Sequence, residues 1–156
     1  MRVLAVPDKF RGTATAPEVA AAVAAAGRRV GARTREMPLS DGGEGFLDAF
    51  GGPNRSLVVT GPLGDPVDAA WRLSGRTAVI EMARASGLAR AGGAERNDPI
   101  AASTLGTGEL IAAALDAGAR RILVGHGGSA TTDGGLAALR ALTPAARLKG
   151  VDLVAA

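Results

Sequence analysis

The chain has 156 residues, of which 47% are hydrophobic and only 3% aromatic, and its formal net charge at pH 7 is +3. It contains no cysteine and one histidine, His126, which excludes disulfide bonds, a cysteine-ligated zinc site, a thiol nucleophile and a multi-histidine metal site. The basic residues are scattered and tyrosine is absent, so the sequence lacks the clustered charge and stacking platforms typical of nucleic-acid-binding proteins.

The order of the residues argues against a membrane-spanning helix and against a signal peptide. No apolar run approaches the roughly 18 residues that a membrane-spanning helix needs. The charged residue Asp8 follows the first apolar run too early for the core of a signal peptide. We therefore expect a cytoplasmic protein with no membrane partner and no nucleic-acid partner.

The first third of the chain alternates between strand and helix patterns. An apolar run at residues 3–6 predicts a buried strand. Residues 15–18 form a capping box that opens an alanine-rich helix, which we expect to end at Gly27. Residues 34–39 predict a second strand and residues 46–50 a short helix. This alternation favours a parallel sheet with crossover helices.

The middle of the chain has a different character. Residues 56–60 are rich in strand formers, and residues 67–73 and 77–82 flank a short turn in the manner of a hairpin. Residues 85–98 are predicted to be a loop rich in glycine and alanine. Antiparallel strands of this kind indicate a second subdomain.

The last third returns to alternating helices and strands. We predict a helix at residues 103–115, a strand at 121–124, a glycine-rich loop at 125–135 and a helix at 136–142. Residues 150–156 read as the start of a buried strand, which suggests that the chain is cut within a larger protein.

Together these patterns predict an α/β fold with two lobes. Residues 1–63 would form a Rossmann-like lobe with a parallel sheet, incomplete without a C-terminal half. Residues 64–156 would form a second α/β lobe that contains antiparallel strands and is truncated at its C-terminus.

Three loops carry side chains suited to chemistry, and the first spans residues 8–13. It follows the first strand and combines the carboxylate of Asp8 with the cations of Lys9 and Arg11. Charge-assisted hydrogen bonds from Lys9 or Arg11 could hold a substrate carboxylate. A solvated loop whose charges pair with one another explains the pattern equally well.

The second loop, residues 41–45, places three glycines among two carboxylates, Asp41 and Glu44. Glycine permits close backbone approach, and free amides at the start of a helix bind anions. The two carboxylates would repel a phosphate unless Mg²⁺ lay between them. A tight turn with Asp41 as a helix cap is the alternative, and spacing alone slightly favours it.

The third loop, residues 127–135, contains four glycines, three hydroxyl side chains and Asp133 between a strand and a helix. In parallel sheets, ligands bind at the carboxyl ends of strands. A flexible surface loop is the less attractive interpretation, because so many glycines are entropically costly. We therefore predict that this loop binds a ligand.

Two nucleotide motifs can be tested against this loop. A Walker A loop needs a lysine, and none lies between Lys9 and Lys149, so that motif is excluded. Residues 125–130 do fit the G-x-G-x-x-A form of a dinucleotide-binding oxidoreductase, with Asp152 about twenty residues on as the ribose-binding acid. A lone histidine such as His126 is more often structural than catalytic.

Six successive segments resemble the type 1 glycerate kinase family. They are residues 7–13, 38–45, 61–64, 80–88, 105–111 and 127–135. They occur in the order found in the family and extend over most of the chain. Members of that family continue well beyond a strand like residues 150–156, so the sequence resembles the N-terminal portion of such an enzyme.

The resemblance implies ATP-dependent phosphorylation of D-glycerate, with ATP and Mg²⁺ as cofactors. The product implied is 2-phosphoglycerate, as is usual in bacterial members, or 3-phosphoglycerate. The family fold has two α/β lobes with the site in the cleft between them. Alone, this chain is expected to be inactive.

Phosphoryl transfer requires positioning, charge neutralisation and a carboxylate that accepts the hydroxyl proton. As hypotheses, Asp41 or Asp8 acts as the base or orients glycerate. Lys9 or Arg11 then holds the glycerate carboxylate.

The remaining hypotheses concern the nucleotide. Glu44 or Asp133 would face Mg²⁺. The phosphates would be held by amides and hydroxyls of Gly127, Gly128, Ser129 and Thr131.

One alternative is not enzymatic. The chain could be an inactive remnant or an interaction module whose uncovered apolar surface leads to a homo-oligomer.

Overall fold

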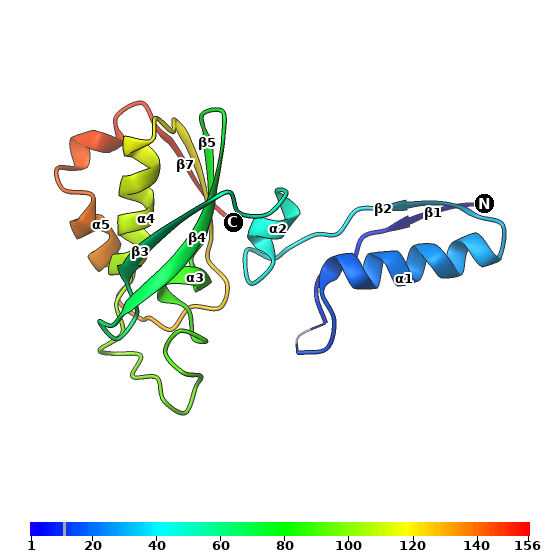
Figure 1. Ribbon diagram of the computed structural model, residues 1–156, viewed down its shortest axis with the longest axis horizontal. Helices are drawn as coiled ribbons and strands as arrows, with labels where there is room; N and C mark the ends of the chain where they lie inside the picture. The colour runs from blue at the N-terminus through cyan, green and yellow to red at the C-terminus, as the bar shows by residue number, and fades with distance from the viewer. Residues whose placement is uncertain (11) are drawn as a thin grey trace. The chain divides into compact units, whose positions relative to one another are not determined.

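The computed structural model describes residues 1–10 and 12–156 and divides them into two compact units, Met1–Asp41 and Gly42–Ala156 (Figure 1). The sequence suggested a boundary between residues 63 and 64 instead. The difference arises because β3 (Arg55–Thr60) pairs along its length with β4 (Pro66–Ser74) and so belongs to the second unit.

The first unit is a parallel β-α-β arrangement. Strands β1 (Arg2–Ala5) and β2 (Arg33–Glu36) pair in parallel and are joined by helix α1 (Ala16–Arg29) (Figure 1). The predicted capping box is confirmed, since the Thr15 hydroxyl accepts the Glu18 N–H while the Glu18 carboxylate accepts the Thr15 N–H at 2.7 Å.

Helix α1 presents only alanine side chains to its buried face. Ala16, Ala20 and Ala24 are buried at a spacing of four residues, which lets the helix approach closely. The predicted end of this helix at Gly27 is wrong, because the helix continues to Arg29. A Cβ on Gly27 would lie 2.7 Å from Cγ2 of Thr34, so this glycine permits packing against β2 rather than ending the helix.

The second unit is built on a five-stranded sheet in the order β3-β4-β5-β6-β7. Strands β4 and β5 (Thr77–Glu81) form the predicted hairpin, and β3 extends it antiparallel. Strands β6 (Arg121–Gly125) and β7 (Asp152–Ala155) continue the sheet in parallel from β5. The α/β class predicted from the sequence is therefore confirmed.

Four α-helices and a 3₁₀ turn accompany this sheet. They are α2 (Phe46–Ala49), α3 (Ala83–Ser86), α4 (Leu105–Asp116), α5 (Leu136–Ala141) and the turn Ala145–Leu148. The core of the unit lies where α4 meets the sheet, and it contains Trp71, Ile80, Leu110 and Ile122. Burial of such large apolar side chains supplies most of the stability of a domain of this kind.

Two further local predictions differ from the structure. Helix α3 begins at Ala83 and occupies the start of a segment that was predicted to be a loop. Strand β7 was predicted to be buried, yet three of its four residues are exposed, because it pairs with β6 along one side at the end of the sheet. Within the described part of the chain, no helix is long and apolar enough to cross a membrane.

Candidate functional site

The loops after β1 and β2 run side by side. Met37 donates its backbone N–H to the Ala5 carbonyl at 2.8 Å, and Leu39 donates to the Pro7 carbonyl at 3.0 Å. The strand pairing thus continues past the carboxyl ends of both strands, where parallel sheets place their ligands. This extension brings the residues that follow, Lys9 and Asp41, together.

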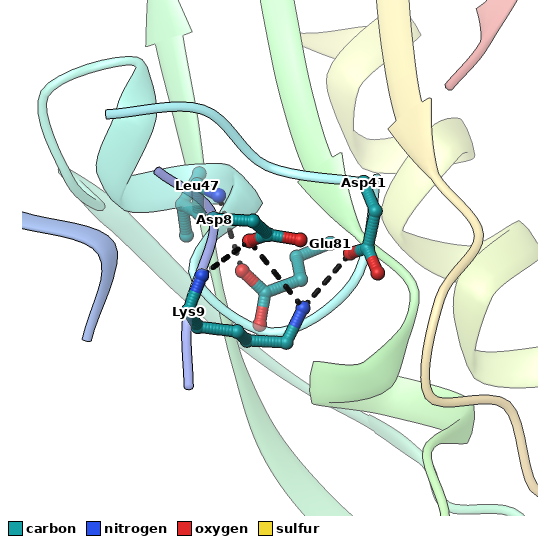
Figure 2. Close-up of polar contacts among 5 residues, drawn as sticks. All are labelled: Asp8, Lys9, Asp41, Leu47 and Glu81. Carbon is teal, nitrogen blue, oxygen red and sulfur yellow. Dashed lines mark hydrogen bonds and ion pairs between the residues drawn. The ribbon is translucent and has the colours of Figure 1, made fainter. Parts of the chain in front are cut away.

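Lys9 lies between two carboxylates in the first unit (Figure 2). Its Nζ donates to Oδ1 of Asp41 at 2.8 Å and lies 3.9 Å from Oδ1 of Asp8. The same Asp8 oxygen accepts the backbone N–H of Lys9 at 2.6 Å. Three residues that the sequence singled out therefore form one charged cluster, whereas Arg11 lies outside the described residues.

The cluster combines a fixed cation with accessible carboxylates. The Lys9 side chain is only 16% exposed, while that of Asp41 is 55% exposed. An ammonium in this position orients the neighbouring carboxylate, which is about half exposed. A carboxylate of this cluster can accept a proton from a hydroxyl group, and the Lys9 ammonium can donate to an acidic group of a ligand.

The two glycine-rich loops pack backbone against backbone within the second unit. Gly127 donates its N–H to the Gly42 carbonyl at 3.0 Å. A Cβ on Gly127 would lie 2.3 Å from Cα of Gly43, and one on Gly125 would lie 2.4 Å from the Gly42 oxygen. These glycines are therefore required by the contact between the loops, which the sequence did not indicate.

The four residues predicted to bind phosphate differ in how accessible they remain to a ligand. The N–H of Gly127 is used by Gly42, and that of Thr131 donates to Oγ of Ser129 at 3.0 Å. Gly128 and Ser129 are exposed. Of the four residues predicted to bind phosphate, these two are therefore the most accessible.

The geometry contradicts the dinucleotide-binding alternative. In that fold the glycine motif opens a helix directly, whereas here the next helix, α5, starts only at Leu136. Residues 128–130 instead lie beside the residues at the end of α3, with an antiparallel bridge between Gly87 and Ser129. Asp152 pairs in register with Arg121 at the start of β6, far along the strand from the glycine loop that follows Gly125.

Asp133 has a structural role that the sequence did not reveal. Its Oδ2 accepts the hydroxyl of Thr104 at 2.7 Å and the backbone N–H of Thr104 at 3.0 Å, and its Oδ1 accepts the Gly135 N–H. Partial burial raises the pKa of Asp133, but the hydrogen bonds from Thr104, Gly135 and Ala137 together outweigh it and hold the pKa below its usual range. The carboxylate thereby ties the start of α4 to the start of α5.

We expect Asp133→Asn to lower the free energy of unfolding by about 1–2 kcal/mol at pH 7, because charge-assisted hydrogen bonds are lost. Since the folded-state pKa is lowered, this contribution is full above the unfolded pKa, about 4, and disappears as the pH falls through the folded value. Urea titrations between pH 7 and pH 3, followed by the fluorescence of the buried Trp71, measure the difference.

The control is Asp152→Asn, which removes an exposed carboxylate that pairs with Arg121 at 3.4 Å. Exposed pairs of this kind contribute little, so this variant should match the unaltered chain at every pH. An Asp133→Asn difference that grew as the pH fell would contradict the interpretation.

Two candidate functional residues, Glu81 and Arg84, were not predicted from the sequence. Glu81, at the end of β5, is 3% exposed and accepts the backbone N–H of Leu47 at 3.1 Å (Figure 2). Its other oxygen lies 3.4 Å from Nε of Arg84 on α3. The available signal was a glutamate at the end of a buried strand, three residues before an arginine.

The residues proposed for Mg²⁺ fit it only in part. Glu44 is exposed, while both oxygens of Asp133 accept hydrogen bonds. Among residues 1–10 and 12–156, no three acidic or histidine side chains gather as a metal cage. Mg²⁺ in phosphoryl-transfer sites needs only one or two protein carboxylates beside phosphates and water, which Glu44 can supply.

Comparison with known proteins finds glycerate kinases among the relatives of this chain. The chain is 49% identical to a glycerate kinase of Bacillus subtilis over 91% of this chain and 39% of that protein. It is 44% identical to glycerate 2-kinase of Escherichia coli over the same shares. A crystal structure assigned as glycerate kinase 2 from Salmonella typhimurium superposes with a TM-score of 0.75 at 43% identity, covering 91% of this chain and 40% of that one.

The chain therefore spans about two-fifths of the length of these relatives. The sequence profile of the glycerate kinase family matches residues 3–150, which is nearly the whole chain. This protein belongs to the glycerate kinase family.

Proposed function

We propose that the protein containing this chain transfers the terminal phosphoryl group of ATP to a hydroxyl of D-glycerate. The observation that carries the proposal is the Lys9–Asp41 pair at the ends of two parallel strands, in a chain of this family. The product would be 2-phosphoglycerate or 3-phosphoglycerate, together with ADP. Because the reaction consumes ATP and a small metabolite, we place it in the cytoplasm.

The first unit would handle glycerate. Asp41, or Asp8 beside it, accepts the proton as the glycerate oxygen bonds to phosphorus and ADP leaves. Lys9 attracts the glycerate carboxylate while orienting Asp41. Together these groups supply positioning and a proton acceptor, so no covalent intermediate on the protein is needed.

The second unit would handle the nucleotide. The exposed backbone and hydroxyl of Gly128 and Ser129 contact phosphate, and Glu44 faces Mg²⁺. Mg²⁺, when bound, neutralises phosphate charge. Support for this assignment comes from the position of the loop after β6, at the carboxyl end of a parallel strand.

The test measures ADP formation that depends on D-glycerate. Because the chain spans 39% of its Bacillus subtilis relative, we would assay the chain alone and a hybrid enzyme in which residues 3–150 replace the matching segment of that relative. We expect turnover by the hybrid enzyme, with the product identified by its phosphorus NMR spectrum. A hybrid that folds but consumes no ATP with D-glycerate would contradict the proposal.

A further inference from the structure

Arg84 lies beside the loop predicted to hold phosphate, although no role was predicted for it from the sequence. Its helix α3 touches that loop, since a Cβ on Gly128 would lie 3.3 Å from the Cβ of Ala83. Just after α3, Leu88 donates its N–H to the Gly128 carbonyl at 2.8 Å, and Ser86 accepts the Ala130 N–H at 3.0 Å. The segment carrying Arg84 is therefore fixed along residues 128–130.

The guanidinium of Arg84 is held at one end only. Its Nε is buried and lies 3.4 Å from Oε1 of Glu81, an ion pair without hydrogen-bond geometry. The side chain is 31% exposed, and because Nε is buried this exposure belongs to the rest of the side chain. Within residues 1–10 and 12–156, neither terminal nitrogen makes a hydrogen bond, so these donors are available to a ligand.

Glu81 anchors this arginine. Its side chain is 4% exposed, and its second oxygen accepts the N–H of Leu47, which follows the loop of residues 42–45. A buried carboxylate requires such partners, because leaving it unpaired is costly. The Glu81–Arg84 pair thus sits between the segments that bear the two packed glycine loops, all within the second unit.

We propose that Arg84 binds a phosphate group of the nucleotide, a role that rests on the kinase function proposed above. A guanidinium presents a planar fork of donors that matches phosphate oxygens in a bidentate manner. Arg84 is the cation that α3 brings beside this loop, with Glu81 as the positioning residue.

The test compares binding of ATP, ADP and adenosine to the chain by calorimetry. We expect Arg84→Gln to raise the dissociation constants of ATP and ADP about tenfold or more while that of adenosine changes less than about twofold. Arg90→Gln is the matched control, since it removes the same charge from an exposed arginine of the same segment. It should leave all three constants unchanged.

Arg84→Gln leaves Glu81 buried without its cation and could unfold the chain. The double variant Glu81→Gln/Arg84→Gln removes both charges, keeps an acceptor for the Leu47 N–H, and should lose ATP affinity to the same extent. Equal losses for ATP and adenosine, or an unchanged dissociation constant for ATP, would overturn the role of Arg84. If the unaltered chain binds no ATP, the nucleotide role of the second unit fails, and this inference fails with it.

Discussion

Asp41→Asn should lower kcat of the hybrid enzyme with D-glycerate about 100-fold or more, since positioned proton acceptors contribute factors of this size. Asparagine preserves the shape of the side chain and can still accept the Lys9 ammonium, but it cannot take up the hydroxyl proton. Steady-state kinetics with varied D-glycerate and ATP separate this effect from a change in KM.

Asp8→Asn decides between the two carboxylates that face Lys9. Asp41 lies 2.8 Å from Nζ and is 55% exposed, whereas Asp8 lies 3.9 Å away and also holds the Lys9 backbone N–H. This geometry favours Asp41 as the base, so Asp8→Asn should mainly raise the KM for D-glycerate.

Glu36→Gln is the control for both variants, because Glu36 is an exposed carboxylate of the same unit that pairs with Arg28. It should leave kcat and KM unchanged. A kcat for Asp41→Asn within about threefold of the unaltered hybrid enzyme would exclude Asp41 as the base.

Local signals in the sequence predicted much of the fold. The capping box at Thr15 and the hairpin between β4 and β5 depend on residues close in sequence, and both are present. Gly27 illustrates the limit: a glycine near the end of a helix is typical of a C-cap, but here it accommodates Thr34 on β2. That contact depends on how α1 packs on the strand, which no local pattern records.

In the candidate site too, the sequence indicated single residues but not the contacts between them. The sequence identified Lys9 and Asp41 as separate candidates, but their contact joins residues 32 positions apart and depends on the pairing of β1 with β2. Glu81 was predicted only as part of a strand, and Arg84 was missed because no helix was predicted at α3. Their pairing becomes visible only when burial shows that the glutamate needs a partner.

The glycine-rich loops were predicted to serve a ligand, yet packing explains part of their composition. We expect Gly127→Ala to lower the free energy of unfolding of the second unit by about 3 kcal/mol, as overpacking against rigid neighbours does. The new Cβ would lie 2.3 Å from Cα and 2.6 Å from N of Gly43, and backbone atoms cannot rotate away. Urea unfolding followed by the fluorescence of buried Trp71 measures the loss.

Gly134→Ala separates packing from backbone strain in the same loop. Gly134 has a φ of +61° and nothing within 4 Å of an added Cβ, so its substitution carries only the left-handed penalty, about 1–2 kcal/mol. Gly127 has no such backbone constraint, and its larger expected effect must come from the backbone of Gly42 and Gly43. Equal losses in the two variants would show that the loops separate at little cost, which would leave Gly127 free to serve a ligand instead.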